Sequence, residues 1–191
     1  MILTGPEIKE QINLGNIEID PYVPEHVNPA SIDLTLGEEV LQYIVRGVVR
    51  CFGEHKVYDP GSYLDSKIEN DYARTFLSDG LILEPGNLYL MHTVERVRAT
   101  RFVPIIDGKS SLGRLGVSIH QTAGYGDPGF DGQYTMEVTC VLPVRLYAGM
   151  RIAQIRFHAV QGVVEDYKRR GNYVGERATG PVPSQSWRQF K

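Results

Sequence analysis

The sequence has few cysteines and no long hydrophobic run, and these absences exclude several classes of protein. Cys51 and Cys140 are the only cysteines in 191 residues, and neither belongs to a Cys-x-x-Cys pair. A disulfide framework is therefore excluded, and a structural zinc site is not expected. No apolar segment has membrane-spanning length, and residues 1–7 do not resemble a secretory signal. We expect an intracellular protein without a membrane partner, in the cytoplasm or, for a viral protein, the host cytoplasm.

An excess of positive charge is also missing. Lys and Arg number 20 against 23 Asp and Glu, which gives a formal net charge of -3 at pH 7. Such a chain lacks the broad basic face that neutralises the phosphates of duplex nucleic acid, so we expect no nucleic-acid partner. The hydrophobic fraction of 42% and the charged fraction of 23% are typical of soluble globular proteins, and the length fits a single domain over residues 1–191.

Short β-rich stretches, separated by 20 glycines and 11 prolines, dominate the chain. They predict strands at residues 17–19, 31–36, 40–49, 81–83, 89–94, 105–106, 117–119, 134–141, 144–146 and 152–157. Near the start, Thr4, Pro6, Glu7 and Gly15 frame a capped amphipathic helix. The pattern predicts a mainly β fold, an antiparallel sandwich or barrel, with a short N-terminal helix.

Two segments depart from this pattern. Residues 61–76 are more polar and mix charges, which favours a partly helical insertion. Residues 166–191 form a C-terminal tail of basic residues among glycines, prolines and serines, a composition typical of a solvated, flexible end. The tail also contains Tyr167, Tyr173 and Trp187, so the alternative is a lid that orders over an anionic ligand.

One polar block is suited to binding phosphate. Residues 107–116 read Asp-Gly-Lys-Ser-Ser-Leu-Gly-Arg-Leu-Gly, follow an apolar strand, and could form one helical turn at 112–115. Backbone N–H groups at such a turn would suit a phosphate chain, together with two hydroxyls and two cations, those of Lys109, Ser110, Ser111 and Arg114. The block lacks the glycine spacing of a P-loop, so a polar surface turn stays open on local pattern alone.

Two acids follow this block. Strand alternation places Glu137 on the same face as Thr135 and opposite Met136, which by itself indicates a solvent-facing acid. Asp127 lies in a Gly-Asp-Pro-Gly loop, where a turn-forming role explains it. We interpret His120 as a core or interface histidine. The remaining histidines show no metal-ligand spacing, and the His-x-Glu and Pro-Cys-x-x-Cys motifs of zinc-dependent nucleobase deaminases are absent.

Several motifs along nearly the whole chain occur together in one known family. They are the Met-Ile-Leu-Thr start with its helix, residues 29–37, the block at 108–116, His-Gln-Thr-Ala-Gly at 120–124, Asp-Pro-Gly-Phe at 127–130, Glu137, residues 146–152 and residues 180–186. On these motifs the chain resembles the dCTP deaminase branch of the dUTPase superfamily. The resemblance implies a distorted jelly-roll β fold, a homotrimer with active sites between subunits, and zinc-independent hydrolytic deamination of a deoxycytidine nucleotide, most simply dCTP.

The resemblance also implies roles for individual residues. Glu137 matches the catalytic glutamate, which takes a proton from water and later protonates the departing amine. Ser110 and Arg114 would position the water and stabilise charge on the pyrimidine. The other implied substrate-binding residues are Lys109 and Ser111 at the phosphates, Thr122 and Ala123 at the base, Asp127 at the deoxyribose 3′-hydroxyl, and Thr135, Met136, Tyr167, Asn172 and Glu176. Mg²⁺ is expected on the triphosphate, held by phosphate oxygens and water, and dTTP or dUTP are further candidate ligands.

Departures from the family pattern bear on substrate and product. Gly124 and Tyr125 resemble the bifunctional members, which carry dCTP through to dUMP. Gly126 replaces an aliphatic residue and is expected to loosen its loop. Asn172 and Glu176 stand where the family has a lysine and a glutamine, which would disfavour a triphosphate and leaves a preference for dCMP open.

Two other functions stay open at this point. A dUTP diphosphatase would use Asp127 as its essential acid. A nucleotide-sensing or partner-binding protein of the same fold would bind a nucleotide without turnover. Substituting Glu137 by Gln separates the two enzymes, because only the deaminase needs this carboxylate.

Overall fold

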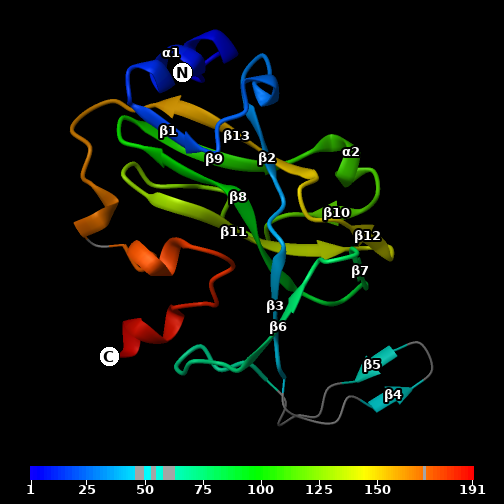
Figure 1. Ribbon diagram of the computed structural model, residues 1–191. Helices are drawn as coiled ribbons and strands as arrows, with labels where there is room; N and C mark the ends of the chain where they lie inside the picture. Colours follow the sequence, from blue (N-terminus) through cyan, green and yellow to red (C-terminus); the bar gives the residue numbers. More distant parts are fainter. Residues whose placement is uncertain (46–49, 53–54, 58–62, 170) are drawn as a thin grey trace.

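The computed structural model describes residues 1–45, 50–52, 55–57, 63–169 and 171–191, and side chains for all of these except residues 50–52, 55–57 and 176–177. The elements, shown in Figure 1, are α1 (Gly5–Asn13), β1 (Ile17–Asp20), η1 (Pro24–His26), β2 (Ile32–Thr35), β3 (Glu39–Tyr43), β4 (Arg50–Phe52), β5 (His55–Val57), β6 (Tyr72–Phe76), β7 (Leu81–Leu83), β8 (Tyr89–Ala99), β9 (Phe102–Gly108), α2 (Ser110–Gly113), β10 (Val117–Ser118), β11 (Asp131–Cys140), β12 (Val144–Leu146), β13 (Arg151–Ala159), η2 (Tyr167–Arg169), η3 (Gly175–Ala178) and η4 (Ser186–Phe190).

Two antiparallel sheets pack around one core. The larger sheet has the strand order β10-β11-β8-β3-β6, with β1 paired to the far end of β8, and the smaller has the order β2-β13-β9. Both sheets contribute to a single hydrophobic cluster, which includes Leu34, Met91, Met136 and Phe157, each at most 1% exposed. In Figure 1 strands β13 and β9 of the smaller sheet lie above strands β8 and β11 of the larger one. The prediction of a mainly β sandwich is therefore confirmed.

Strand β11 carries a regular sequence signal. Its residues alternate strictly between half-buried and buried, so that Glu137 lies on the opposite face from Met136. The strand pairs with β8, with Glu137 opposite Leu90. The predicted alternation is confirmed, because a side-chain period of two is a local property of an extended chain.

The N-terminal helix is also confirmed and begins after Thr4 as expected, but without the expected capping contacts. Thr4 is the N-cap residue of α1, but its side chain makes no capping hydrogen bond. The carboxylate of Glu7 instead accepts a hydrogen bond from Nε2 of Gln11, at 2.7 Å. Gly15 has a φ of 72°, a conformation that suits glycine at a helix end.

Two predictions about segments need correction. Within the described residues 63–76 there is no helix, and Tyr72–Phe76 is the edge strand β6, paired with β3. An edge strand contacts the sheet on one side and leaves much of its surface in solvent, so its polar composition resembled that of an insertion. The strand predicted at 40–49 ends at Tyr43, and residues 46–49 lie outside the described part of the chain.

The C-terminal tail packs back onto the larger sheet. It contains the short helices η2, η3 and η4, and η3 lies against β11. Gly132 of β11 is in such close contact with Ala178 that a Cβ at this glycine would overlap it. The tail is therefore in contact with the strand that carries Glu137, an arrangement closer to the predicted lid than to a solvated end.

Candidate active site

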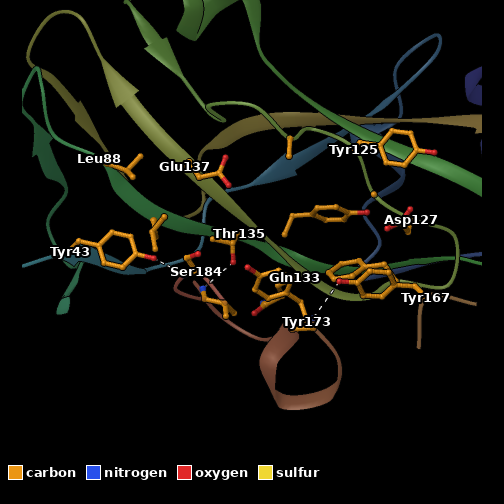
Figure 2. A pocket seen from close by; sticks show the side chains of 17 residues that line it. Tyr43, Leu88, Tyr125, Asp127, Gln133, Thr135, Glu137, Tyr167, Tyr173 and Ser184 are labelled. Atoms are coloured by element: carbon orange, nitrogen blue, oxygen red, sulfur yellow. Dashed lines mark hydrogen bonds between the residues drawn. The ribbon is translucent and has the colours of Figure 1, made fainter. Parts of the chain in front are cut away.

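A cleft of about 430 Å³ lies beside Glu137. Three parts of the chain form most of its wall, as Figure 2 shows: strand β11, the loop at residues 123–130, and the tail. The lining residues are Gln133, Tyr134, Thr135 and Glu137 from β11, Ala123, Tyr125, Gly126, Asp127 and Phe130 from the loop, Tyr167, Tyr173, Ala178, Val182 and Ser184 from the tail, and Tyr43, Leu88 and Leu90 from the neighbouring strands and loop.

Two carboxylates lie in this cleft. Glu137 comes from the middle of β11, and Oε2 of its side chain accepts a hydrogen bond from the backbone N–H of Gln121, at 3.2 Å. Asp127 comes from the loop, and Figure 2 shows it on the opposite side of the cleft from Glu137. The cleft therefore presents two acids to different parts of a bound molecule.

Aromatic side chains form much of the remaining wall. The ring of Phe130 packs against Tyr134 with a centroid distance of 5.0 Å, and against Tyr167, edge to face, at 5.7 Å. Burial raises the pKa of Tyr43, Tyr134 and Tyr167 above the ordinary tyrosine value, so these hydroxyls stay neutral at physiological pH. A cleft of this size with flat apolar walls and a few polar groups suits a planar ring with polar substituents.

The tail is held at the cleft by alternate backbone N–H groups. The N–H of Gly180 donates to Oε1 of Gln133 at 2.7 Å, and the N–H of Val182 donates to Oγ1 of Thr135 at 3.0 Å. The N–H of Ser184 donates to the hydroxyl of Tyr43 at 2.6 Å. An extended segment of the tail is thus fastened across strands β11 and β3 by their side chains.

The predicted phosphate-binding block forms a helical turn after strand β9, but this turn, α2, spans Ser110–Gly113 and begins two residues before the predicted 112–115. The ammonium of Lys109 lies 2.5 Å from Oδ1 of Asp33, and Arg151 lies 3.3 Å from Oδ2 of the same buried carboxylate. Among the described residues that line the cleft, none comes from α2. The single chain therefore does not bring Lys109, Ser110, Ser111 or Arg114 to the cleft that contains Glu137.

Of the other predicted site residues, some line the cleft and the rest do not. Five line the cleft, namely Ala123, Asp127, Thr135, Glu137 and Tyr167. Thr122 and Asn172 are exposed and lie outside the lining, and the side chain of Glu176 lies outside the described part of the structure. The side chain of Met136 is 1% exposed and belongs to the core, so only its backbone could contact a ligand.

Sequence reasoning missed several cleft residues, chiefly Tyr43, Gln133, Tyr173 and Ser184. Tyr173 stood out as an aromatic residue in the tail, but its place in the cleft depends on how the tail packs. Tyr43 and Ser184 are 141 positions apart in the chain, and no local pattern reports their hydrogen bond.

The described part of the chain has neither a metal-binding cluster nor a membrane-spanning helix. Within the described ranges, no group of three or more His, Cys, Asp or Glu side chains is arranged to hold a metal ion. None of the described helices has the length and apolar character needed to cross a membrane.

A known structure has the same mainly β fold. The crystal structure of 2′-deoxycytidine 5′-triphosphate deaminase from Agrobacterium tumefaciens superimposes with a TM-score of 0.59 and 24% sequence identity, covering 86% of this chain and 50% of that chain. The fold is thus that of the dCTP deaminases.

The sequence comparisons define the family. A model described as dCTP deaminase-like matches residues 2–160, and the chain belongs to this family. A protein of Hathewaya histolytica named dCTP deaminase, dUMP-forming is 41% identical over 192 residues, covering 100% of both chains. A protein of Cytophaga hutchinsonii with the same name is 39% identical over 192 residues, covering 100% of this chain and 99% of the other.

Proposed function

We propose that this protein deaminates dCTP by hydrolysis and carries the product on to dUMP. The observation that carries the proposal is the carboxylate of Glu137 in an aromatic cleft, where the N–H of Gln121 holds one of its oxygens. Membership of the dCTP deaminase-like family supports the first reaction. The names of the full-length relatives support dUMP as the final product.

Glu137 supplies the proton transfers of the deamination. Its carboxylate takes a proton from water, and the resulting hydroxide attacks C4 of the cytosine ring. The same group then protonates the amine, the C4–N bond breaks, and ammonia leaves, so that dCTP and water give dUTP and ammonia. Ser110 and Arg114 of a neighbouring subunit would place the water and stabilise the charge that develops on the ring.

Asp127 is suited to the second hydrolysis. It lies in the same cleft on the other side from Glu137, where it would contact the sugar hydroxyl. From there its carboxylate orients a second water toward the α-phosphate, and dUTP and water give dUMP and diphosphate. A single cleft with two separated acids thus accommodates both reactions without release of dUTP.

The charges in the cleft support completion of the site by a second copy of the chain. The described lining contains two acids, Asp127 and Glu137, and no lysine or arginine, whereas a triphosphate carries several negative charges. The cations of the phosphate-binding block, Lys109 and Arg114, lie elsewhere on the same chain. We therefore infer that α2 of one subunit completes the cleft of the next, in the homotrimer that the family resemblance implies.

An exposed apolar patch supports this assembly. Leu115 is 50% exposed, Val141 73% and Leu142 61%. They are adjacent, because the N–H of Val141 donates to the carbonyl of Gly116 at 3.0 Å. Exposed apolar groups that gather beside a functional element commonly mark an interface, and these lie next to α2.

The phosphates of the nucleotide offer Mg²⁺ better ligands than the described side chains do. Within the described residues no cluster of carboxylates or histidines could hold a metal ion, and Mg²⁺ readily keeps phosphate oxygens and waters as ligands. The ion would therefore enter bound to the nucleotide, where it neutralises part of the phosphate charge.

The test is to incubate the purified protein separately with dCTP, dCMP and dUTP and to measure ammonia and all nucleotide products. We expect ammonia and dUMP from dCTP, and dUMP from dUTP. Ammonia from dCMP alone would assign the monophosphate as substrate. Hydrolysis of dUTP without any deamination would identify a dUTP diphosphatase, and nucleotide binding without turnover would identify a sensor.

Glu137→Gln separates the two reactions. We expect it to lower the rate of ammonia release by a factor of about 10²–10⁴, because general acid–base catalysis is lost, while dUTP hydrolysis continues. The matched control is Glu10→Gln, an exposed acid of α1 outside the cleft, which should leave both rates unchanged. A Glu137→Gln variant with wild-type ammonia release would overturn the proposal.

A further inference from the structure

Gly126 and Tyr134 meet beneath the loop that carries Asp127. A Cβ built on Gly126 would overlap the hydroxyl oxygen of Tyr134 and would lie 2.9 Å from Cγ of Pro104. The φ of Gly126 is not positive, so its backbone conformation is open to any residue. Glycine is required here because it leaves space for the tyrosine hydroxyl, and not because of its conformational freedom.

The loop around Gly126 is hydrogen-bonded to strand β9. The N–H of Gly126 donates to the carbonyl of Pro104 at 2.8 Å, and the N–H of Ile106 donates to the carbonyl of Gly124 at 2.7 Å. Gly126 is buried between β9 on one side and Tyr134 on the other. The expectation that this glycine loosens the loop is therefore wrong, because the loop is held on both sides immediately before Asp127.

Tyr134 occupies an irregular point of strand β11. Gln133 pairs with Arg96 and Thr135 pairs with His92, so the ladder with β8 is interrupted between them. The N–H of Tyr134 donates instead to Oγ1 of Thr93, at 3.0 Å. This interruption lets the ring belong both to the hydrophobic core and to the wall of the cleft, next to Phe130.

The hydroxyl of Tyr134 is unusual for a buried polar group. Its oxygen is inaccessible to solvent and has no hydrogen-bond partner among the described residues. A buried hydroxyl without a partner is unfavourable, so its retention calls for an explanation. A phenylalanine at position 134 would fill the same core without this cost. It would lack the hydroxyl, and with it the contact to Gly126.

We propose that Gly126 and Tyr134 form a size-matched pair that positions the carboxylate of Asp127 for recognition of the substrate's 3′-hydroxyl. Tyr134 acts through the loop and is a positioning residue. The inference rests on the proposed function, because Asp127 is assigned to the sugar hydroxyl there. It adds a determinant of sugar recognition that lies outside direct contact with the substrate.

A double-mutant cycle tests the pair. The proteins are the wild type, Gly126→Ala, Tyr134→Phe and the double variant, and Tyr147→Phe is a control in which a half-exposed tyrosine outside the cleft loses its hydroxyl. Each is assayed for deamination of dCTP and of 2′,3′-dideoxycytidine triphosphate, which lacks the 3′-hydroxyl. The ratio of the two kcat/KM values measures how well Asp127 recognises this group.

The proposal predicts a specific loss and a specific rescue. Gly126→Ala should lower the ratio by about tenfold or more, since the added methyl displaces Asp127, whereas a general loss of stability would lower both kcat/KM values alike. Tyr134→Phe alone should lower the ratio by about two- to fivefold. The double variant should recover a measurable part of the ratio lost in Gly126→Ala, because the methyl then occupies the space of the missing hydroxyl, while its close approach to Pro104 remains.

Thermal unfolding of the same proteins separates this inference from the proposed function. Gly126→Ala should lower the Tm. In the Tyr134→Phe background the same substitution should lower the Tm by less, whether or not the protein deaminates dCTP. If the coupling is found and no protein releases ammonia, the proposed function fails and the packing of the pair stands. If the wild type is active but Gly126→Ala keeps its ratio, or the double variant is no better than Gly126→Ala, the inference is overturned. If Gly126→Ala fails to fold and the double variant folds, the inference is supported. If both Gly126→Ala and the double variant fail to fold, the inference is contradicted.

Discussion

The backbone N–H of Gln121 donates a hydrogen bond to Oε2 of Glu137, the residue proposed to move protons during deamination. The side chain of Gln121 fastens the same loop to β11, because Nε2 donates to Oγ1 of Thr139 at 3.1 Å and lies 3.4 Å from the carbonyl oxygen of Glu137. Gln121 is exposed, so these contacts contribute little to the core. They orient the carboxylate and keep one of its oxygens engaged.

Gln121→Ala should therefore lower kcat and leave KM nearly unchanged. Without its side chain the loop is free to move, and the hydrogen bond to Glu137 weakens. Loss of hydrogen bonding worth about 1 kcal/mol corresponds to a fall in kcat of about fivefold. Steady-state kinetics with dCTP measure both constants.

Thr139→Val is the companion variant, because it removes only the hydroxyl that Gln121 binds. It should lower kcat in the same direction by a smaller factor. An equal rise of KM in both variants, with kcat unchanged, would show that Gln121 acts on substrate binding and not on Glu137.

Tyr43→Phe should loosen the tail. The hydroxyl of Tyr43 accepts the hydrogen bond from the N–H of Ser184, and the phenyl ring cannot replace it. One lost hydrogen bond of about 1 kcal/mol should raise the KM for dCTP by about fivefold if the tail must pack to hold the substrate. Hydrogen exchange at residues 180–184 should become faster by a similar factor.

The control is Tyr72→Phe, because Tyr72 pairs with Tyr43 across β3 and β6 but does not line the cleft. It should leave both KM and the exchange rates at their wild-type values. Unchanged exchange at residues 180–184 in Tyr43→Phe would contradict a tail fastened by this tyrosine.

The surroundings of Glu137 and of Tyr43 differ in how much of their structure the sequence predicts. The face of β11 on which Glu137 lies was predictable, because a period of two needs only neighbouring residues. The bond between Tyr43 and Ser184 was not, because it depends on how the tail crosses the sheet. The edge strand β6 was hidden for a related reason, since its exposed residues lack the alternation that marks a half-buried strand.

Gly126 shows a different limit. The sequence reports a glycine, and glycine is most often explained by backbone freedom. The structure shows that the reason is the hydroxyl of Tyr134, eight residues further along the chain and on a different element. A requirement for space depends on a neighbour in three dimensions, and one sequence does not contain that information.

Asp33→Asn should destabilise the protein through the ion pairs at its carboxylate. Asp33 is 2% exposed, and its carboxylate contacts Lys109 at 2.5 Å, Arg151 at 3.3 Å and Asn28 at 2.8 Å. Removing one partner leaves the half-buried ammonium of Lys109 without its anion, which should cost about 3 kcal/mol of unfolding free energy. Chemical denaturation measures this value.

Arg151→Met is the control for Asp33. The side chain of Arg151 is 56% exposed, so its ion pair is screened by water and its loss should cost less than about 1 kcal/mol. Equal losses in the two variants would show that the stability comes from packing around Asp33 and not from the charge of Lys109.

His92 should make the stability of the protein depend on pH. It is 8% exposed, its Nδ1 lies 2.9 Å from the carbonyl of Thr93, and its Nε2 has no partner among the described residues. Burial lowers the pKa of His92 below its ordinary value of 6.5. Between pH 6.5 and the lower pKa of His92 in the folded protein, the unfolded chain therefore binds a proton that the folded protein does not, and the free energy of unfolding falls as the pH drops through this range.

Urea denaturation at a series of pH values below neutrality should show this fall. His92→Asn keeps an N–H group able to donate to the carbonyl of Thr93 and has no titrating ring, so its stability should change less with pH. Burial also lowers the pKa of His158, so His158→Asn should remove a further part of the dependence in the same direction. A His92→Asn protein whose stability falls as steeply as that of the wild type would show that His92 is not the group that titrates.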